Sequence, residues 1–143
     1  MILSQTAEYA LRAVLFIGRQ PEDHLVRVNE IAAALRIPRN YLSKILHALA
    51  RSGVLASTRG KTGGFQLAVP VERLTLVRVV GEFDDVNQRR HCLLGNPVCS
   101  DRTACTAHGQ WKQAAEAVAA FFRDTTIGDL LRDEPSPRLT AAR

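Results

Sequence analysis

The chain has 143 residues, 46% of them hydrophobic, and a formal net charge of +5 at pH 7. This length suits one domain, or a small domain with a dimerisation element, and no apolar run approaches the length that spans a membrane. The first residues make a poor signal peptide, because they include an acidic residue and lack a small-residue cleavage site. We therefore expect a cytoplasmic protein, in which clustered cysteines more often bind metal or sense redox state than form disulfides.

The positive charge lies in the first half of the chain. Residues 1–67 contain nine Lys/Arg and four Asp/Glu, whereas residues 68–143 contain ten of each. Between Arg27 and Lys61 there are seven basic residues and a single acidic one, Glu30. Such a local excess is the electrostatic footprint expected of a surface that binds nucleic acid.

Three helices are predicted in the first third of the chain. Apolar residues at helical spacing indicate a helix over residues 6 to about 19. Asn29 can cap a second, short helix over residues 30–35. A third helix begins at Pro38, whose missing N–H is no loss in a first turn, and runs to about residue 52, with Gly53 just past its end.

A strand, a turn and a second strand follow. Residues 54–57 form a short apolar segment, and residues 59–64 are a glycine-rich turn with two basic side chains. The apolar residues Phe65, Leu67 and Val69 then alternate as in a half-buried strand. The pattern predicts a β-hairpin with a basic tip.

Helices are again predicted in the second half. Residues 75–83 indicate a buried helix, and residues 107–124 a longer amphipathic helix. The last residues, 133–143, are polar and interrupted by proline, which is typical of a disordered tail. We assign residues 1–86 to a DNA-binding domain, 87–106 to a cysteine-rich loop, 107–131 to a dimerisation helix and 132–143 to the tail. The face expected to dimerise carries Trp111, Val118, Phe121 and Phe122.

Two short helices joined by a tight turn, followed by a basic hairpin, predict a winged helix-turn-helix. The expected fold class is mainly α with a small β-hairpin wing and a long C-terminal dimerisation helix. In such motifs the N-terminal residues of the second helix reach base edges in the major groove. The simpler interpretation is a solvated helix face, but the one-sided charge and the hairpin favour DNA. The candidate DNA-binding residues are Arg39, Asn40, Ser43 and Lys44 on the helix, and Arg59 and Lys61 at the wing tip.

All three cysteines lie in one short segment with the spacing C-x6-C-x5-C-x2-H, formed by Cys92, Cys99, Cys105 and His108. Thiolates are soft ligands that select zinc, copper(I) or iron–sulfur clusters, so this segment is a candidate metal site. A Cys3His set could instead hold tetrahedral zinc, the thiols could act as a redox sensor, or they could bind nothing. His91 adjoins the first cysteine, and we treat it as part of the loop.

An enzyme is not expected. The chain has no nucleophile elbow and no HExxH motif, and its glycine turn precedes a strand where a phosphate loop precedes a helix. A cysteine–histidine nucleophilic pair from Cys105 and His108 would also need a substrate cleft, for which such a short domain has little room.

The segment VNEIAAALRIPRNYLSKILHALARSGVLASTRGKTGGFQLA resembles the winged-helix domain of the Rrf-type bacterial regulators, the IscR/NsrR group. The start MILSQTAEYALRAV and the wing pattern RG-x-x-GG-[FY]-x-LA are typical of that family, and the resemblance extends to about Leu131. It implies a homodimer that binds a palindromic operator in double-stranded DNA, with the long helices crossing between subunits. It also implies that Arg59 is the wing arginine, and that Asn40 and Ser43 read bases.

The same resemblance bears on the cysteines. Cluster-binding members carry three cysteines in this loop and a fourth ligand that is not cysteine, and Cys92, Cys99 and Cys105 match those positions. The usual first gap is five residues and here it is six, so a two-iron or a four-iron cluster remains open. The fourth ligand is expected to be His108, with Glu8 of the first helix in the partner subunit as the alternative.

These observations predict a sequence-specific transcription regulator, expected to be a repressor, whose DNA affinity responds to an iron–sulfur cluster. The alternatives are a zinc- or thiol-responsive regulator on the same scaffold, and a cluster-binding protein that does not bind DNA. The basic wing disfavours the last of these. The signal and the operator do not follow from the sequence.

Overall fold

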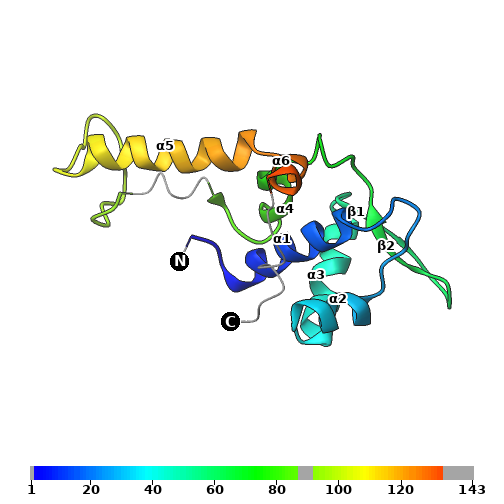
Figure 1. The fold of residues 1–143 in the computed structure, drawn as a ribbon. Coiled ribbons are helices and arrows are strands. Elements are labelled where there is room, and N and C mark those ends of the chain that lie inside the picture. The colour runs from blue at the N-terminus through cyan, green and yellow to red at the C-terminus, as the bar shows by residue number, and fades with distance from the viewer. Residues whose placement is uncertain (1, 87–91, 134–143) are drawn as a thin grey trace.

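The computed structural model describes residues 2–86 and 92–133, so His91 and the tail from residue 134 lie outside the described residues. The mainly helical fold with one hairpin confirms the expected fold class. Figure 1 shows a compact winged-helix body from which one long helix extends as an arm. The elements are α1 (Gln5–Gly18), α2 (Val28–Leu35), α3 (Arg39–Arg51), β1 (Leu55–Thr58), β2 (Gly64–Leu67), α4 (Leu76–Val80), α5 (His108–Asp124) and α6 (Ile127–Arg132).

Helix α1 is the centre of the body and contacts α2, α3, α4, α6 and β2. Its buried face includes Ala7, Ala10 and Ala13, each fully buried, and such small side chains let neighbouring helices approach closely. The apolar face of α3 is buried against this centre. That face consists of Leu42, Ile45, Leu46 and Leu49.

The turn between α2 and α3 is held by backbone geometry. Arg36 ends α2 in the left-handed conformation, with φ of 54°, and the buried side chain of Ile37 anchors the turn. Pro38 stands at the N-cap of α3, where its lack of an N–H costs nothing. The expectation that Asn29 caps α2 is wrong. The helix begins at Val28, two residues before the expected start, and Asn29 Oδ1 accepts a hydrogen bond from Arg39 Nε across the turn.

The wing is an antiparallel hairpin in which Leu55 pairs with Leu67 and Thr58 with Gly64. The sequence pattern did not predict a third extended segment, in which Val26 exchanges two backbone hydrogen bonds with Phe65, at 2.9 and 2.8 Å. A Cβ on Gly64 would lie 2.8 Å from the Val26 carbonyl oxygen, so this close approach requires glycine.

The amphipathic helix expected over residues 107–124 is present as α5, and the segment assigned to dimerisation, residues 107–131, also includes most of a second helix. Helix α5 ends at Asp124, and α6 begins after Thr126 with a capping box. Backbone hydrogen bonds from Leu76 N–H to the Thr125 carbonyl and from Ile127 N–H to the Leu74 carbonyl attach the break to the body. The chain stops being helical here because these strand-like bonds compete with continuation of the helix.

The residues of α5 that were expected to form the dimer interface differ in their burial within the single subunit. Phe122 is 3% exposed and belongs to the core of its own subunit, and Val118 packs partly against that core. Phe121, its ring in edge contact with Phe122, is 50% exposed. Among the helices that the structure describes, none is long and apolar enough to cross a membrane.

Candidate functional site

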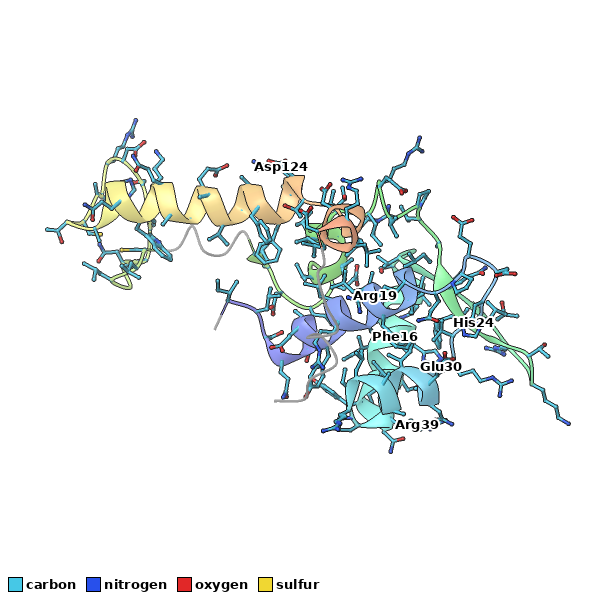
Figure 2. All side chains as sticks on the ribbon, in the orientation of Figure 1. Phe16, Arg19, His24, Glu30, Arg39 and Asp124 are labelled. Carbon is cyan, nitrogen blue, oxygen red and sulfur yellow. The ribbon has the colours of Figure 1, made fainter. Side chains whose placement is uncertain are left out.

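The first candidate surface is the exposed face of α3. Arg39, Asn40 and Lys44 are exposed, and Ser43 is half-buried, so all four stand on the face away from the core. Arg39 lies at the outer edge of the body in Figure 2 and is oriented by its hydrogen bond to Asn29. The four side chains therefore share one basic, polar face.

The wing completes this surface. Arg59 and Lys61 are exposed at the tip of the hairpin, beside Gly60, whose φ of +105° suits glycine. The hairpin is fixed relative to α3 by an edge contact of the His47 ring with Phe65 at 5.6 Å between centroids. The recognition face of α3 and the base of the wing are thus in direct contact.

The second candidate site is the cysteine loop at the N-terminal end of α5. It brings its four predicted ligands together in two pairs. The Sγ atoms of Cys92 and Cys105 are 3.6 Å apart, and Cys99 Sγ lies 3.3 Å from His108 Nδ1. Two sulfur ligands of one tetrahedral metal ion lie about 3.8 Å apart, so the first pair already has the spacing of neighbouring ligands.

Backbone amides prepare one of these thiols for ligation. Hydrogen bonds from the backbone of Asn96, and then of Leu94, lower the pKa of Cys92 against the opposing effect of burial. Because the thiolate is the form that binds metal, this environment favours a ligand. The pKa of Cys99 is raised instead, by desolvation first and then by the charges of Cys92 and Cys105. Cys99 Sγ is nevertheless within hydrogen-bonding distance of the His108 ring nitrogen.

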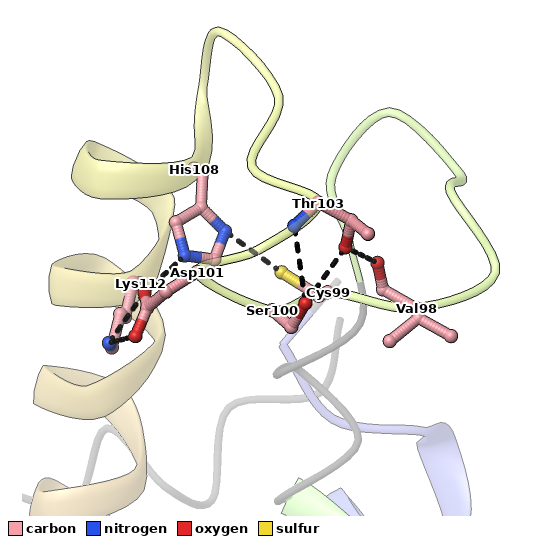
Figure 3. A network of polar contacts seen from close by, with 7 residues as sticks. All are labelled: Val98, Cys99, Ser100, Asp101, Thr103, His108 and Lys112. Carbon is pink, nitrogen blue, oxygen red and sulfur yellow. Dashed lines mark hydrogen bonds and ion pairs between the residues drawn. The ribbon is translucent and has the colours of Figure 1, made fainter.

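The other nitrogen of His108 is also occupied. Its Nε2 lies 2.9 Å from Asp101 Oδ1, and Lys112 Nζ lies 3.1 and 3.3 Å from the two oxygens of the same carboxylate (Figure 3). The hydrogen bond from His108, followed by that from Lys112, lowers the pKa of Asp101. The imidazole is nearly buried, whereas Asp101 and Lys112 are exposed.

The donor set suits a soft metal centre, since three thiols and an imidazole converge on one loop. Among the described residues, however, no three or more His, Cys, Asp or Glu side chains surround one point at which a single metal ion could be held. A depression of about 450 Å³ opens beside the second pair and is lined by Cys99, Asp101, His108 and Trp111. This half of the site is therefore open to small molecules.

Glu8, the alternative fourth ligand, is half-buried in the first turn of α1. Figure 1 shows α1 in the body and the cysteine loop at the distant end of α5, so one chain does not bring them together. Within a subunit the structure places His108 with the cysteines and leaves Glu8 apart.

Sequence reasoning missed Asp101 and Lys112. Lys112 stands four residues after His108, one helical turn away, and this spacing could have suggested a shared partner. The position of Asp101 depends on the path of the loop, for which the sequence carries no comparable signal.

Comparisons with known proteins agree with this architecture. The family model described as Rrf2, an iron-dependent transcriptional regulator, matches residues 3–133. The HTH-type transcriptional regulator NsrR of Geobacillus kaustophilus is 33% identical over 140 residues, covering 96% of this chain and 95% of that one. The regulator IscR of Vibrio atlanticus is 26% identical over 133 residues, covering 93% of this chain and 76% of that one.

A solved structure shares the fold. CymR, the global cysteine regulator of B. subtilis, superposes with a TM-score of 0.77 at 19% identity, over 92% of this chain and 97% of that one. Fold, motif and family model thus agree along nearly the whole described chain. The protein is a member of the Rrf2 family of transcriptional regulators.

Proposed function

We propose that this regulator acts as a homodimer whose affinity for a palindromic DNA operator depends on an iron–sulfur cluster held by Cys92, Cys99, Cys105 and His108. The observation that carries the proposal is the convergence of these four side chains in two contacting pairs at one end of α5. The iron dependence of the matching family, and relatives named NsrR and IscR, support iron over zinc.

DNA contact is proposed for the face of α3 and for the wing. Arg39, Asn40, Ser43 and Lys44 would face the major groove, where arginine and lysine pair with guanine and asparagine with adenine. Arg59 and Lys61 would reach the minor groove or the phosphates beside it. The direct contact between α3 and the hairpin supports simultaneous binding of both.

Dimerisation is proposed for an exposed stripe of α5, which replaces the face expected from the sequence. Residues at positions i, i+4, i+7 and i+11 lie along one side of a helix, as in a coiled-coil seam. On the solvent side of α5 this spacing selects Gln110, Ala114, Ala117 and Phe121, all exposed in the single subunit. Two alanines would let the paired helices cross closely, and the half-exposed phenylalanine would then be covered.

Helix α1 offers a connection between the two sites. The Ser4 N–H, at the start of α1, donates to Asp84 Oδ2 at 2.7 Å, and Asp84 lies shortly before the cysteine loop in the chain. Two residues further on, Thr6 Oγ1 makes a short contact with the Tyr41 hydroxyl of α3. The approach to the loop and the recognition helix are therefore both attached to the first turn of α1.

The cluster would supply a group whose oxidation state or integrity changes with the chemical signal. The chain would respond through the loop, because binding all four ligands requires the two pairs to close on one centre. A ligand shifts an equilibrium between two arrangements only when it binds one of them better. Loop closure would thus be coupled, through α1, to the position of α3.

The test is purification without oxygen, with iron, acid-labile sulfide and zinc measured per subunit. We expect a coloured protein containing iron and sulfide, and expect Cys92→Ala, Cys99→Ala and Cys105→Ala to lose both while remaining folded. Operator binding should then differ between the loaded wild type and these variants at matched salt. Metal content that is unchanged in all three variants would overturn the metal site, and stoichiometric zinc without sulfide would support the zinc regulator instead.

The fourth ligand is tested separately, with His108→Ala and Glu8→Ala each reconstituted without oxygen. Because His108 already contacts Cys99, its loss should alter the visible spectrum and speed cluster loss, while Glu8→Ala should match wild type. The reverse result would assign the ligand to α1 of the partner subunit.

A further inference from the structure

Asp101 and Lys112 form a contact chain behind His108. The imidazole donates to or accepts from two partners at once, with Cys99 on its Nδ1 side and Asp101 on its Nε2 side. Lys112, one turn further along α5, contacts both oxygens of the same carboxylate. In Figure 3 the three side chains form a continuous line that leads from the sulfur to the surface of the helix.

This arrangement determines which ring nitrogen can bind a metal. An ionised carboxylate can only accept hydrogen bonds, so the Nε2 atom that faces Asp101 carries a proton. If the ring binds a metal it needs a lone pair on the other nitrogen, Nδ1, which faces Cys99 Sγ at 3.3 Å. A histidine that binds metal commonly donates its other N–H to a carboxylate, which orients the ring and raises its basicity.

We propose that Asp101, held in place by Lys112, is a positioning residue that presents His108 to the metal centre through Nδ1 and increases electron donation to it. The inference rests on the proposed function, because it requires a metal centre at the cysteine loop. Its support is independent of the family, since it comes from the three contacts around this imidazole and carboxylate. Asp101 itself would not be a ligand, because its carboxylate lies on the far side of the ring.

One substitution can separate the effect of the negative charge of Asp101 from the effect of its hydrogen bond. In Asp101→Asn the amide oxygen can still accept from Nε2–H, but the negative charge is lost. The imidazole then donates less strongly, so the reduction potential of the cluster should rise and its loss to a chelator should accelerate on the order of tenfold. Asp101→Glu restores the charge on a longer side chain and should recover part of the wild-type behaviour.

A matched control exists on the same helix. Asp124 is exposed, is paired with its neighbour Arg123, and lies at the opposite end of α5 from the cysteine loop (Figure 2). Asp124→Asn makes the same change in net charge without touching His108. It should leave the potential and the rate of cluster loss at wild-type values.

The experiment uses the full-length protein, purified and kept without oxygen. Three quantities are measured for wild type and for the variants at positions 101 and 124. They are the midpoint reduction potential of the cluster, its rate of loss in excess EDTA, and the nitrogen hyperfine coupling of the reduced cluster in ¹⁵N-histidine-labelled protein. A purely structural role for Asp101 would change the melting temperature and leave the nitrogen coupling and the potential unchanged.

The outcomes are distinguishable. A raised potential, an altered nitrogen coupling and faster loss in Asp101→Asn, but not in Asp124→Asn, support the inference. Values equal to wild type in Asp101→Asn overturn it while the bound cluster still supports the proposed function. A wild-type protein without iron and sulfide overturns the proposed function itself, and the inference with it.

Discussion

At the scale of single residues, the two cations of the wing tip are expected to make different contributions to DNA binding. Both Arg59 and Lys61 are exposed on a turn that Gly60 allows to be tight. An arginine gains from the strongly negative potential of a narrow minor groove, and so its contribution depends on DNA shape. A lysine that contacts phosphate contributes equally on all sequences and is screened by salt.

We therefore expect Arg59→Ala to weaken operator binding by about 1–3 kcal/mol, with a smaller effect on unrelated DNA. Lys61→Ala should weaken both alike and reduce the slope of log K against log salt by about one. The measurement is fluorescence anisotropy with operator and scrambled duplexes over a series of salt concentrations. Arg123→Ala, an equal loss of charge on α5, is the control, and an operator affinity of Arg59→Ala equal to that of this control would contradict the wing assignment.

At the scale of elements, the break between α5 and α6 is held by a local motif. The Thr126 N–H donates to Asp129 Oδ2 at 2.9 Å, and the Asp129 N–H donates to Thr126 Oγ1 at 3.1 Å. The two residues thereby satisfy each other's free amides at the start of α6. Since α6 contacts α1, the capping box helps to fix the position at which α5 joins the winged-helix body.

Loss of the threonine hydroxyl should destabilise the fold. Thr126→Ala is expected to lower the free energy of unfolding by about 1 kcal/mol. Thr75→Ala is the matched control, because Thr75 also stands at an N-cap, that of α4, but its side chain makes no cap hydrogen bond. Urea unfolding followed by circular dichroism measures both, and equal losses in the two variants would refute a specific role for the box.

The same box should contribute a pH dependence. The backbone N–H of Thr126, followed by its hydroxyl, lowers the pKa of Asp129. Because the folded pKa lies below the unfolded one, this contribution is fully present above the ordinary carboxyl pKa and is lost as the pH falls through the folded value. The difference in stability between wild type and Asp129→Asn should therefore shrink in that acidic range.

At the scale of the whole molecule, the exposed stripe of α5 suggests how two subunits would meet. Phe121→Asp places a charge at the C-terminal end of the proposed seam, where burial without a partner is costly. We expect this variant to sediment as a monomer and to lose operator affinity, while its melting transition stays cooperative. Arg123→Asp changes an exposed residue two positions along the same helix, and it should remain a dimer.

A wild-type protein that sediments as a monomer at micromolar concentration and still binds its operator specifically would contradict the dimer. The result would also remove the reason to expect a palindromic site, since two recognition helices about 34 Å apart are what such a site requires.

The sequence by itself determined the local features of this protein. Helical and alternating apolar periodicity identified α1, α3 and the hairpin, because each has one buried face whose spacing shows in the residues. Proline and glycine marked the turns, and the cysteine spacing identified the candidate ligands. The basic first half indicated the nucleic-acid surface, since charge requires no knowledge of packing.

What only the tertiary structure decided depends on contacts between residues far apart in the chain. Phe121 and Phe122 are adjacent phenylalanines, yet Phe122 is buried in the core of its own subunit and Phe121 is half-exposed. The pairing of Val26 with β2 likewise arises from a backbone partner that no local pattern specifies. Asp101 stands behind His108 because the loop folds back on α5, and that path, set by packing rather than by residue spacing, completes the candidate metal site.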